Sequence, residues 1–195
     1  MGKIVVSDNV SLDGVFQDPA GDEGFARGGW VGLIKDRPEL ARLALDEALG
    51  AEAMLMGRRT YEWFAARWPS RSGPLADRLN SMPKYVVSST LVDPGWTSAT
   101  VVRGELLSEV SKLKAERSGE IVVLASSGIV RTLMQHGLVD ELRLKVFPVV
   151  LGAGERLFGE TDGTNGLRFV DVRTLDGDTA YLIYENVRGQ GSETR

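Results

Sequence analysis

The sequence predicts an α/β fold, a three-layer α-β-α sandwich with a mostly parallel mixed sheet and a C-terminal antiparallel hairpin. Short β-rich runs alternate with helical segments along most of the chain, an order that favours a parallel sheet covered on both faces. The last two β-rich runs are joined by Asp176-Gly177-Asp178, which is typical of a hairpin turn. The length of 195 residues suits a single domain, placed at residues 1–188 with a flexible tail at residues 189–195.

The first predicted element is a strand over residues 3–10, because this segment has a β-rich apolar centre. Residues 11–30 contain five glycines, and a loop of this length is often functional. A helix follows over residues 36–50, since Asp36 can cap its first turn and Gly50 can end it.

The apolar run at residues 53–56 predicts a buried strand that ends at Gly57. Aromatic residues at helical spacing then predict a helix over residues 59–68, and β-rich runs predict strands over residues 84–89 and 97–102. The same patterns predict helices over residues 105–116 and 129–136 and strands over residues 120–125, 140–150, 167–174 and 179–187.

The composition excludes several classes of function. A formal net charge of −4 indicates no basic surface for nucleic acid. The chain has no cysteine and one histidine, which excludes disulfides, thiolate nucleophiles and multi-histidine metal sites, so we expect no metal. No apolar run reaches the length of a membrane span or a secretory signal. We therefore expect a cytoplasmic protein that binds a small molecule.

Three polar segments follow predicted strands, at the edge where open α/β sheets bind ligands. In the first, Gly57 permits a sharp turn into a helix, and Arg58, Arg59 and Thr60 at the start of that helix suit a phosphate. An ordinary helix start with solvated arginines explains the same residues, so this segment alone leaves both interpretations open.

The second segment, Ser88-Ser89-Thr90, offers three hydroxyls to phosphate oxygens, or forms a simple polar turn. The third places Ser126, Ser127 and Gly128 between a buried strand and a helix. Small side chains there let a diphosphate approach the first amides of the helix. An N-capping serine explains one of these residues but not the whole pattern.

Ordered motifs in the chain resemble a known family. Residues 56–62, MGRRTYE, resemble the G-R-x-T-[WY]-E element of dihydrofolate reductases, and residues 84–89 resemble the strand that follows it. The chain is more similar still to the reductase domain of riboflavin-biosynthesis deaminase-reductases and its stand-alone relatives. The S-L-D-G, G-L-V-D-E-L and P-V-x-L-G-x-G motifs of that domain resemble residues 11–14, 137–142 and 148–154.

This resemblance covers residues 3–187 and implies a dihydrofolate-reductase-like fold with an NADPH site. It implies that the adenosine 2′-phosphate lies near the first two polar segments, the diphosphate near the third, and the nicotinamide beside the loop after the first strand. The implied cofactor-binding residues are Leu12, Asp13, Gly14, Gly57, Arg58, Arg59, Thr60, Ser88, Ser89, Thr90, Ser126, Ser127, Gly128, Ile129 and Val130.

No residue of this chain clearly matches the substrate-binding carboxylate of dihydrofolate reductases. Dihydrofolate reductases bind the pterin through a carboxylate on the helix after the mobile loop, but Asp36, Asp46 and Glu47 do not match it by their spacing from Gly57. We expect Asp36 to cap this helix, and Asp46 and Glu47 to lie on its solvated face. Asp13 and Asp36 are the candidate catalytic residues.

Two aromatic residues are candidate substrate contacts. Trp30 ends the glycine-rich loop, and Phe147 lies at a predicted strand end. His136 falls at a helix C-terminus, where an imidazole suits the helix dipole.

The resemblance implies an NADPH-dependent reductase of a small conjugated C=N or C=O substrate, pterin-like or ribosylaminopyrimidine-like, and suggests a homodimer. The alternative is a catalytically silent NADPH- or nucleotide-binding module, which the missing acid favours. A hydrolase that pairs Ser126 or Ser127 with His136 requires proton transfer over roughly 13–15 Å, at about 1.5 Å per helical residue, which is too far.

Overall fold

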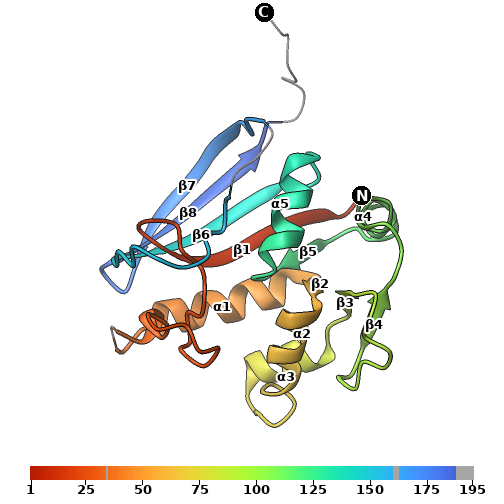
Figure 1. Cartoon of the computed structure of the whole chain (residues 1–195), viewed down its shortest axis with the longest axis horizontal. Coiled ribbons are helices and arrows are strands. Elements are labelled where there is room, and N and C mark those ends of the chain that lie inside the picture. Colours follow the sequence, from red (N-terminus) through yellow and green to blue (C-terminus); the bar gives the residue numbers. More distant parts are fainter. Residues whose placement is uncertain (34, 160–162, 188–195) are drawn as a thin grey trace, which may run out of the picture.

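The computed structural model describes residues 1–33, 35–159 and 163–187, so the predicted tail at residues 189–195 lies outside the described residues. One mixed sheet forms the centre of the molecule, with helices on both of its faces (Figure 1). The strands are β1 (Lys3–Ser11), β2 (Ala51–Gly57), β3 (Lys84–Val87), β4 (Ala99–Val102), β5 (Glu120–Val123), β6 (Glu141–Phe147), β7 (Leu167–Leu175) and β8 (Thr179–Asn186).

The strand order is β4-β3-β2-β5-β1-β6-β8-β7. Every pair from β4 to β6 is parallel, whereas β8 pairs antiparallel with both β6 and β7. The α/β fold class and the C-terminal hairpin are therefore confirmed. Asp176 and Gly177 both have positive φ in the hairpin turn, which explains why short residues stand there.

The helices are α1 (Pro38–Gly50), α2 (Arg58–Ala65), α3 (Pro74–Ser81), α4 (Leu106–Glu116) and α5 (Ser127–Gln135), with a short 3₁₀ helix, η1 (Trp30–Leu33). Within the described ranges, none of them is long and apolar enough to cross a membrane.

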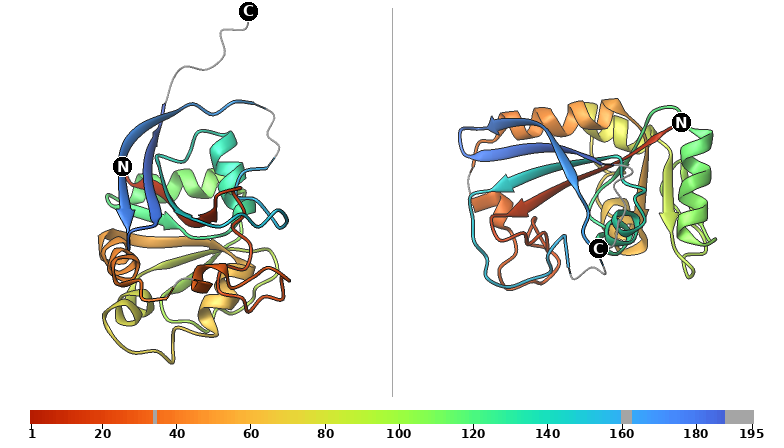
Figure 2. Two further views of the ribbon diagram at one scale, coloured as in Figure 1. Left: turned by 90° about the vertical axis from the view of Figure 1, so that its left-hand side faces the viewer. Right: turned by 90° about the horizontal axis from the view of Figure 1, so that it is seen from above.

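The core is divided by the sheet into two layers (Figure 2). On one face, α4 and α5 pack on side chains such as Ile4 and Val123. On the other, α1, α2 and α3 pack on Met54 and Val122. Neighbours such as Val122 and Val123 point to opposite faces because side chains alternate along a strand, so both faces of the parallel sheet are apolar.

Several observed strands are shorter than predicted, and two of them end early for a clear local reason. The strand expected over residues 84–89 ends at Val87, because the Ser88 hydroxyl accepts hydrogen bonds from the amides of Thr90 and Leu91 and turns the chain. The strand expected over residues 140–150 ends at Phe147, because Pro148 has no amide to donate. The short helix α3 was not predicted; it buries only Ala76 and Leu79.

The expectation that Asp36 caps α1 is wrong. Arg37 occupies the N-cap position without a side-chain capping bond. The cap comes from the distant hairpin turn, where the Asp176 carboxylate accepts hydrogen bonds from the amides of Glu39 and Leu40 at 3.0 and 3.1 Å. A contact between residues this far apart in the sequence is invisible to a local capping rule.

The glycine-rich loop after β1 lies against the segment that follows β6 (Figure 2). The Phe16 amide donates to the Glu155 carbonyl at 3.1 Å, and Val15 forms a bridge with Arg156. The two segments therefore support each other at the carboxyl edge of the sheet.

Candidate functional site

A cavity of about 850 Å³ lies at the carboxyl edge of the sheet. Here β5 turns into α5 while β1 continues beside β6, so the cavity forms where the parallel strands separate, as expected for α/β sheets. We call its two polar regions the open end, formed by Arg58, Arg59, Thr60, Ser126, Ser127 and Gly128, and the buried end, formed by Ser7, Asp8, Glu47 and Lys145.

The open end is built where α2 and α5 begin. The Ser126 hydroxyl accepts a hydrogen bond from the Gly57 amide at 3.0 Å and lies 2.9 Å from the Thr60 hydroxyl. Two of the three predicted segments are therefore joined directly. The side chains of Arg58 and Arg59 are 48% and 83% exposed, so this end carries two solvent-facing cations.

The backbone of the open end departs from the local prediction. Gly57 has φ −79° and ψ 166°, so the turn into α2 does not need a glycine, contrary to the expectation. The left-handed residues are instead Ala125 and Ser126, with φ of 49° and 60°. A Cβ at Gly128 would meet nothing within 4 Å, which leaves the first turn of α5 accessible from the cavity.

The second predicted segment contributes indirectly. Ser88, Ser89 and Thr90 do not line the cavity. However, Arg58 donates a hydrogen bond to the Thr90 hydroxyl at 3.0 Å. The segment thus orients an arginine of the open end.

A carboxylate also borders the open end. The Ser127 hydroxyl donates to Glu155 at 2.6 Å, and Arg131 pairs with the same carboxylate at 3.2 Å. This pairing offsets the negative charge beside the start of α5.

Asp13 holds the loop rather than facing the cavity. Its carboxylate accepts hydrogen bonds from the amides of Leu151 and Gly152 at 3.0 and 2.8 Å and from the Ser11 hydroxyl at 2.7 Å. These bonds, that of Leu151 foremost, hold the pKa of Asp13 well below its usual range. Its neighbours Leu12 and Gly14 also lie outside the lining.

Several other predicted site residues lie away from the cavity wall. Trp30 is 2% exposed and packs edge-on against Phe147, 1% exposed, with a centroid distance of 5.4 Å. Val130 is buried in the core of the sheet, although its neighbour Ile129 does line the cavity. Asp36 does not line the cavity either. The burial of Trp30, Phe147 and Val130 indicates packing positions.

The buried end contains the residues that sequence reasoning missed. Glu47 was expected on a solvated helix face, and this expectation is wrong, since its side chain is only 10% exposed. It accepts hydrogen bonds from the hydroxyls of Ser7 and Tyr181, both at 2.9 Å, and pairs with Lys145 at 3.2 Å. Lys145 also donates to the Ser7 hydroxyl at 2.5 Å. Four elements, β1, α1, β6 and β8, thus meet in one polar network.

Asp8 is the other carboxyl group of the buried end. It is 8% exposed, and its Oδ1 accepts a hydrogen bond from the Ala125 amide at 2.8 Å. Burial raises the pKa of Asp8 to about 7, with the Ala125 hydrogen bond and the Lys145 charge acting against the rise and Glu47 adding to it. Asp8 therefore changes charge near neutral pH.

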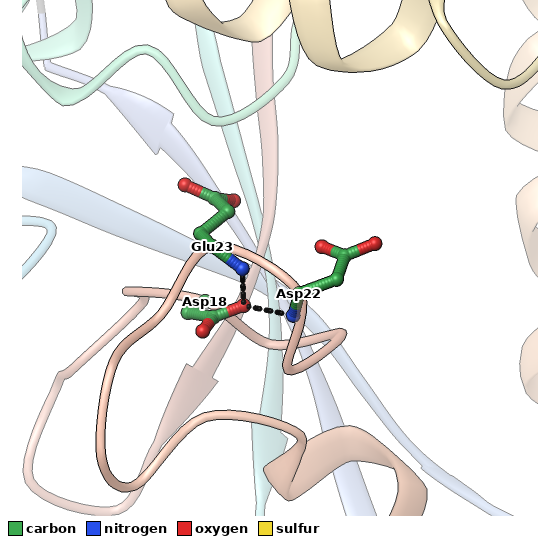
Figure 3. A group of neighbouring side chains, drawn as sticks. All are labelled: Asp18, Asp22 and Glu23. Carbon is green, nitrogen blue, oxygen red and sulfur yellow. Dashed lines mark hydrogen bonds between the residues drawn. The ribbon is translucent and has the colours of Figure 1, made fainter.

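A cluster of acidic residues lies in the loop after β1, and two of them, Asp18 and Glu23, line the cavity. Asp18, Asp22 and Glu23 place carboxylate oxygens within 4.8 Å of one another. Figure 3 shows that Asp18 Oδ1 accepts hydrogen bonds from the backbone amides of Asp22 and Glu23. Asp22 in turn accepts from the Trp63 indole at 2.8 Å and pairs with Arg67 at 2.6 Å. These bonds give the cluster a structural role, shaping the loop and fastening it to α2.

A sequence signal for the buried end did exist. Lys145 interrupts the β-rich run of β6, and Ser7-Asp8 interrupts that of β1. Charged residues are rarely buried without a partner. Polar residues within the apolar runs of two adjacent strands therefore indicated a common polar site. The identity of the third partner, Glu47, required the packing of α1.

Comparison with known proteins finds a matching family and a curated relative. The RibD C-terminal domain family matches residues 2–181. Among curated proteins, the uncharacterized protein YyaP of Bacillus subtilis strain 168 is 29% identical over 138 residues, which cover 68% of this chain and 73% of YyaP.

Two solved structures share the fold. A "putative riboflavin biosynthesis protein" from Shewanella sp. PV-4 superposes with a TM-score of 0.75 at 22% identity, covering 96% of this chain and 100% of the other. A pyrimidine reductase-like protein from Corynebacterium diphtheriae superposes with a TM-score of 0.68 at 14% identity, covering 96% and 93%. The dihydrofolate-reductase-like architecture is therefore confirmed.

Proposed function

The chain belongs to the RibD C-terminal domain family, and from this premise we propose that it is an NADPH-dependent reductase of a small, flat, conjugated C=N or C=O substrate. Members of this family are typically NAD(P)H-dependent reductases. NADPH supplies a hydride when bound, and the protein contributes binding, orientation and exclusion of water.

The observation that carries the proposal is the open end of the cavity. Two helices begin there with accessible first turns, and amides at a helix start favour an anion. Gly128 leaves space for a phosphate to approach α5, and Arg58 and Arg59 lie beside α2. Amides near α5 suit a diphosphate, and the arginines suit a second phosphate group. The residues present therefore fit NADPH.

The preference for NADPH over NADH follows from the arginines. A 2′-phosphate carries charge that guanidinium groups bind with paired hydrogen bonds, whereas a ribose hydroxyl does not require them. Arg58 donates a hydrogen bond to the Thr90 hydroxyl, and its Nε lies 3.6 Å from Glu62 Oε1. Both arginines are exposed enough to bind a ligand without first losing a buried partner.

The buried end weakens the alternative of a silent binding module. That alternative rested on the lack of an acid, but Asp8 places a carboxyl group on the cavity wall. A module that only binds nucleotide has no need of a buried titratable group in the wall of its cavity.

We would test the proposal by thermal stabilisation with NADPH and NADH at equal concentration. At one hundred times Kd, a ligand adds roughly 2.7 kcal/mol, which corresponds to a rise in Tm of about 5–10 °C for a chain of this size. We expect the larger rise with NADPH, and oxidation of NADPH with a panel of conjugated heterocycles. Absence of stabilisation by both nucleotides would refute the proposed function.

A further inference from the structure

Two residues that line the cavity have a buried polar side-chain atom without a hydrogen-bond partner among the described residues, Trp68 Nε1 and Asp8 Oδ2, and Asp8 Oδ2 is the one that belongs to the buried end. Asp8 Oδ2 is buried and has no hydrogen-bond partner within residues 1–33, 35–159 and 163–187. The other oxygen, Oδ1, is already held by the Ala125 amide. Burial of a carboxylate oxygen without a partner costs free energy, so such an atom in a cavity wall suits a ligand donor.

The neighbouring polar groups do not meet this requirement, because they satisfy one another. Ser7, Glu47, Lys145 and the Tyr181 hydroxyl form a closed network. Lys145 acts on Asp8 only through its charge. Asp8 is therefore the member of the buried end whose hydrogen-bonding capacity remains for a ligand.

The charges around Asp8 indicate which ligand it accepts. When ionised, Asp8 and Glu47 together outweigh the single charge of Lys145, so the buried end is net negative. Arg37, which also lines the cavity, binds Asp178 at 2.7 Å and Thr179 at 2.6 Å. Among the described residues, the cations that line the cavity with well-exposed side chains are Arg58 and Arg59, at the open end, whereas Arg37 and Lys145 are buried in ion pairs.

From these contacts we propose that Asp8 is the substrate-binding carboxyl group, and that it recognises an N–H donor on a flat, neutral or cationic nitrogen heterocycle. This inference rests on the proposed function only in calling the ligand a substrate. It also predicts that a phosphate or carboxylate on the substrate is excluded from the buried end, because the cation that the described residues place there, Lys145, is already paired with Glu47.

Two flat probes of similar size test the inference in the cofactor-free protein. The donor probe is 2-aminopyridine, and the anionic probe is pyridine-2-carboxylate. We expect binding of 2-aminopyridine, measured by titration calorimetry at pH 7.5, to be at least about tenfold tighter. We expect Asp8→Asn to lower its affinity by about tenfold or more, because the amide offers a donor where the carboxylate offered an acceptor.

The matched control is Asp46→Asn, the same chemical change on the exposed face of α1, outside the cavity lining. It should leave the affinity for 2-aminopyridine unchanged. Equal affinity of the wild type for the two probes, or undiminished binding by Asp8→Asn, would overturn the inference.

A second measurement avoids dependence on the variant's folding. In wild-type protein with ¹³C-carboxyl aspartate, the resonance that titrates near pH 7 should shift when 2-aminopyridine is added. A resonance that does not shift on saturation overturns the inference. NADPH stabilisation is measured separately, so failure of the cofactor assignment and failure of the Asp8 assignment give different results.

Discussion

The two ends of the cavity are built in opposite ways. At the open end, the arginine side chains are 48% and 83% exposed and come from residues adjacent in sequence. At the buried end, the side chains of Lys145 and Glu47 are 9% and 10% exposed and come from different elements. Exposed charges bind anions with strength that salt can weaken, whereas buried groups select a ligand by what they can pair with. We infer that the open end provides cofactor affinity and the buried end provides substrate choice.

The largest expected effect is a loss of stability when the ion pair between Lys145 and Glu47 at the buried end is removed. Lys145→Met leaves the Glu47 carboxylate buried without its cation, which typically costs about 3–5 kcal/mol. We expect Tm to fall by about 2–4 °C for each kcal/mol lost, measured by calorimetry. Lys112→Met, on an exposed pair with Glu109, should change stability by less than about 0.5 kcal/mol. Adding Glu47→Gln to Lys145→Met should recover part of the loss, and a double variant no more stable than the single one would contradict this account.

The pH dependence of stability sharpens the comparison. Burial raises the pKa of Asp8 in the folded state to about 7, above its ordinary value of 3.8, so between these values the folded state binds the extra proton. Stability is therefore lost as pH rises through this window. Between pH 5 and pH 8, the wild type should lose about 2–3 kcal/mol more than Asp8→Asn, as measured by urea unfolding. Parallel pH profiles for the two proteins would show that Asp8 titrates normally, and Asp46→Asn should follow the wild type.

Removal of the arginines of the open end should change the affinity for NADPH rather than the stability of the protein. Replacing Arg58 and Arg59 together by alanine should weaken NADPH binding by about 10–100-fold, the loss expected for one or two charge-assisted hydrogen bonds. The affinity for NADH should change less, so the preference between the two cofactors should shrink. Fluorescence titration measures both constants, and Arg42→Ala, an exposed arginine outside the cavity lining, is the control. Equal losses for NADPH and NADH would show that the arginines do not bind the 2′-phosphate.

The smallest expected effect is the response to salt. Raising the ionic strength from 0.1 to 1 M shortens the screening length from about 10 to about 3 Å. NADPH binding should weaken by about 3–10-fold, because the arginines are exposed, whereas 2-aminopyridine binding should change by less than about twofold. Similar salt dependence at both ends would remove the physical distinction between them.

The sequence alone was sufficient to predict which segments form the open end, because its residues lie in two short local segments. Gly57 to Thr60 and Ser126 to Gly128 each follow a β-rich run, and the carboxyl edge of a parallel sheet brings such segments together. The structure confirms that these two segments meet. The Ser88 segment reaches the open end through the hydrogen bond from Arg58 to Thr90, a detail that depends on side-chain packing.

The sequence alone therefore determined the alternation of strands and helices, the terminal hairpin and the family resemblance, because each is recorded in local patterns of residues. Only the tertiary structure decided which carboxylates line the cavity and which one caps α1. The hydrogen-bonded pairs among Ser7, Glu47, Lys145 and Tyr181 are 40 to 138 positions apart in the chain, and Asp176 caps a helix 137 positions away. Such groups acquire their role from burial, which removes water as an alternative partner, and burial is a property of the packed molecule.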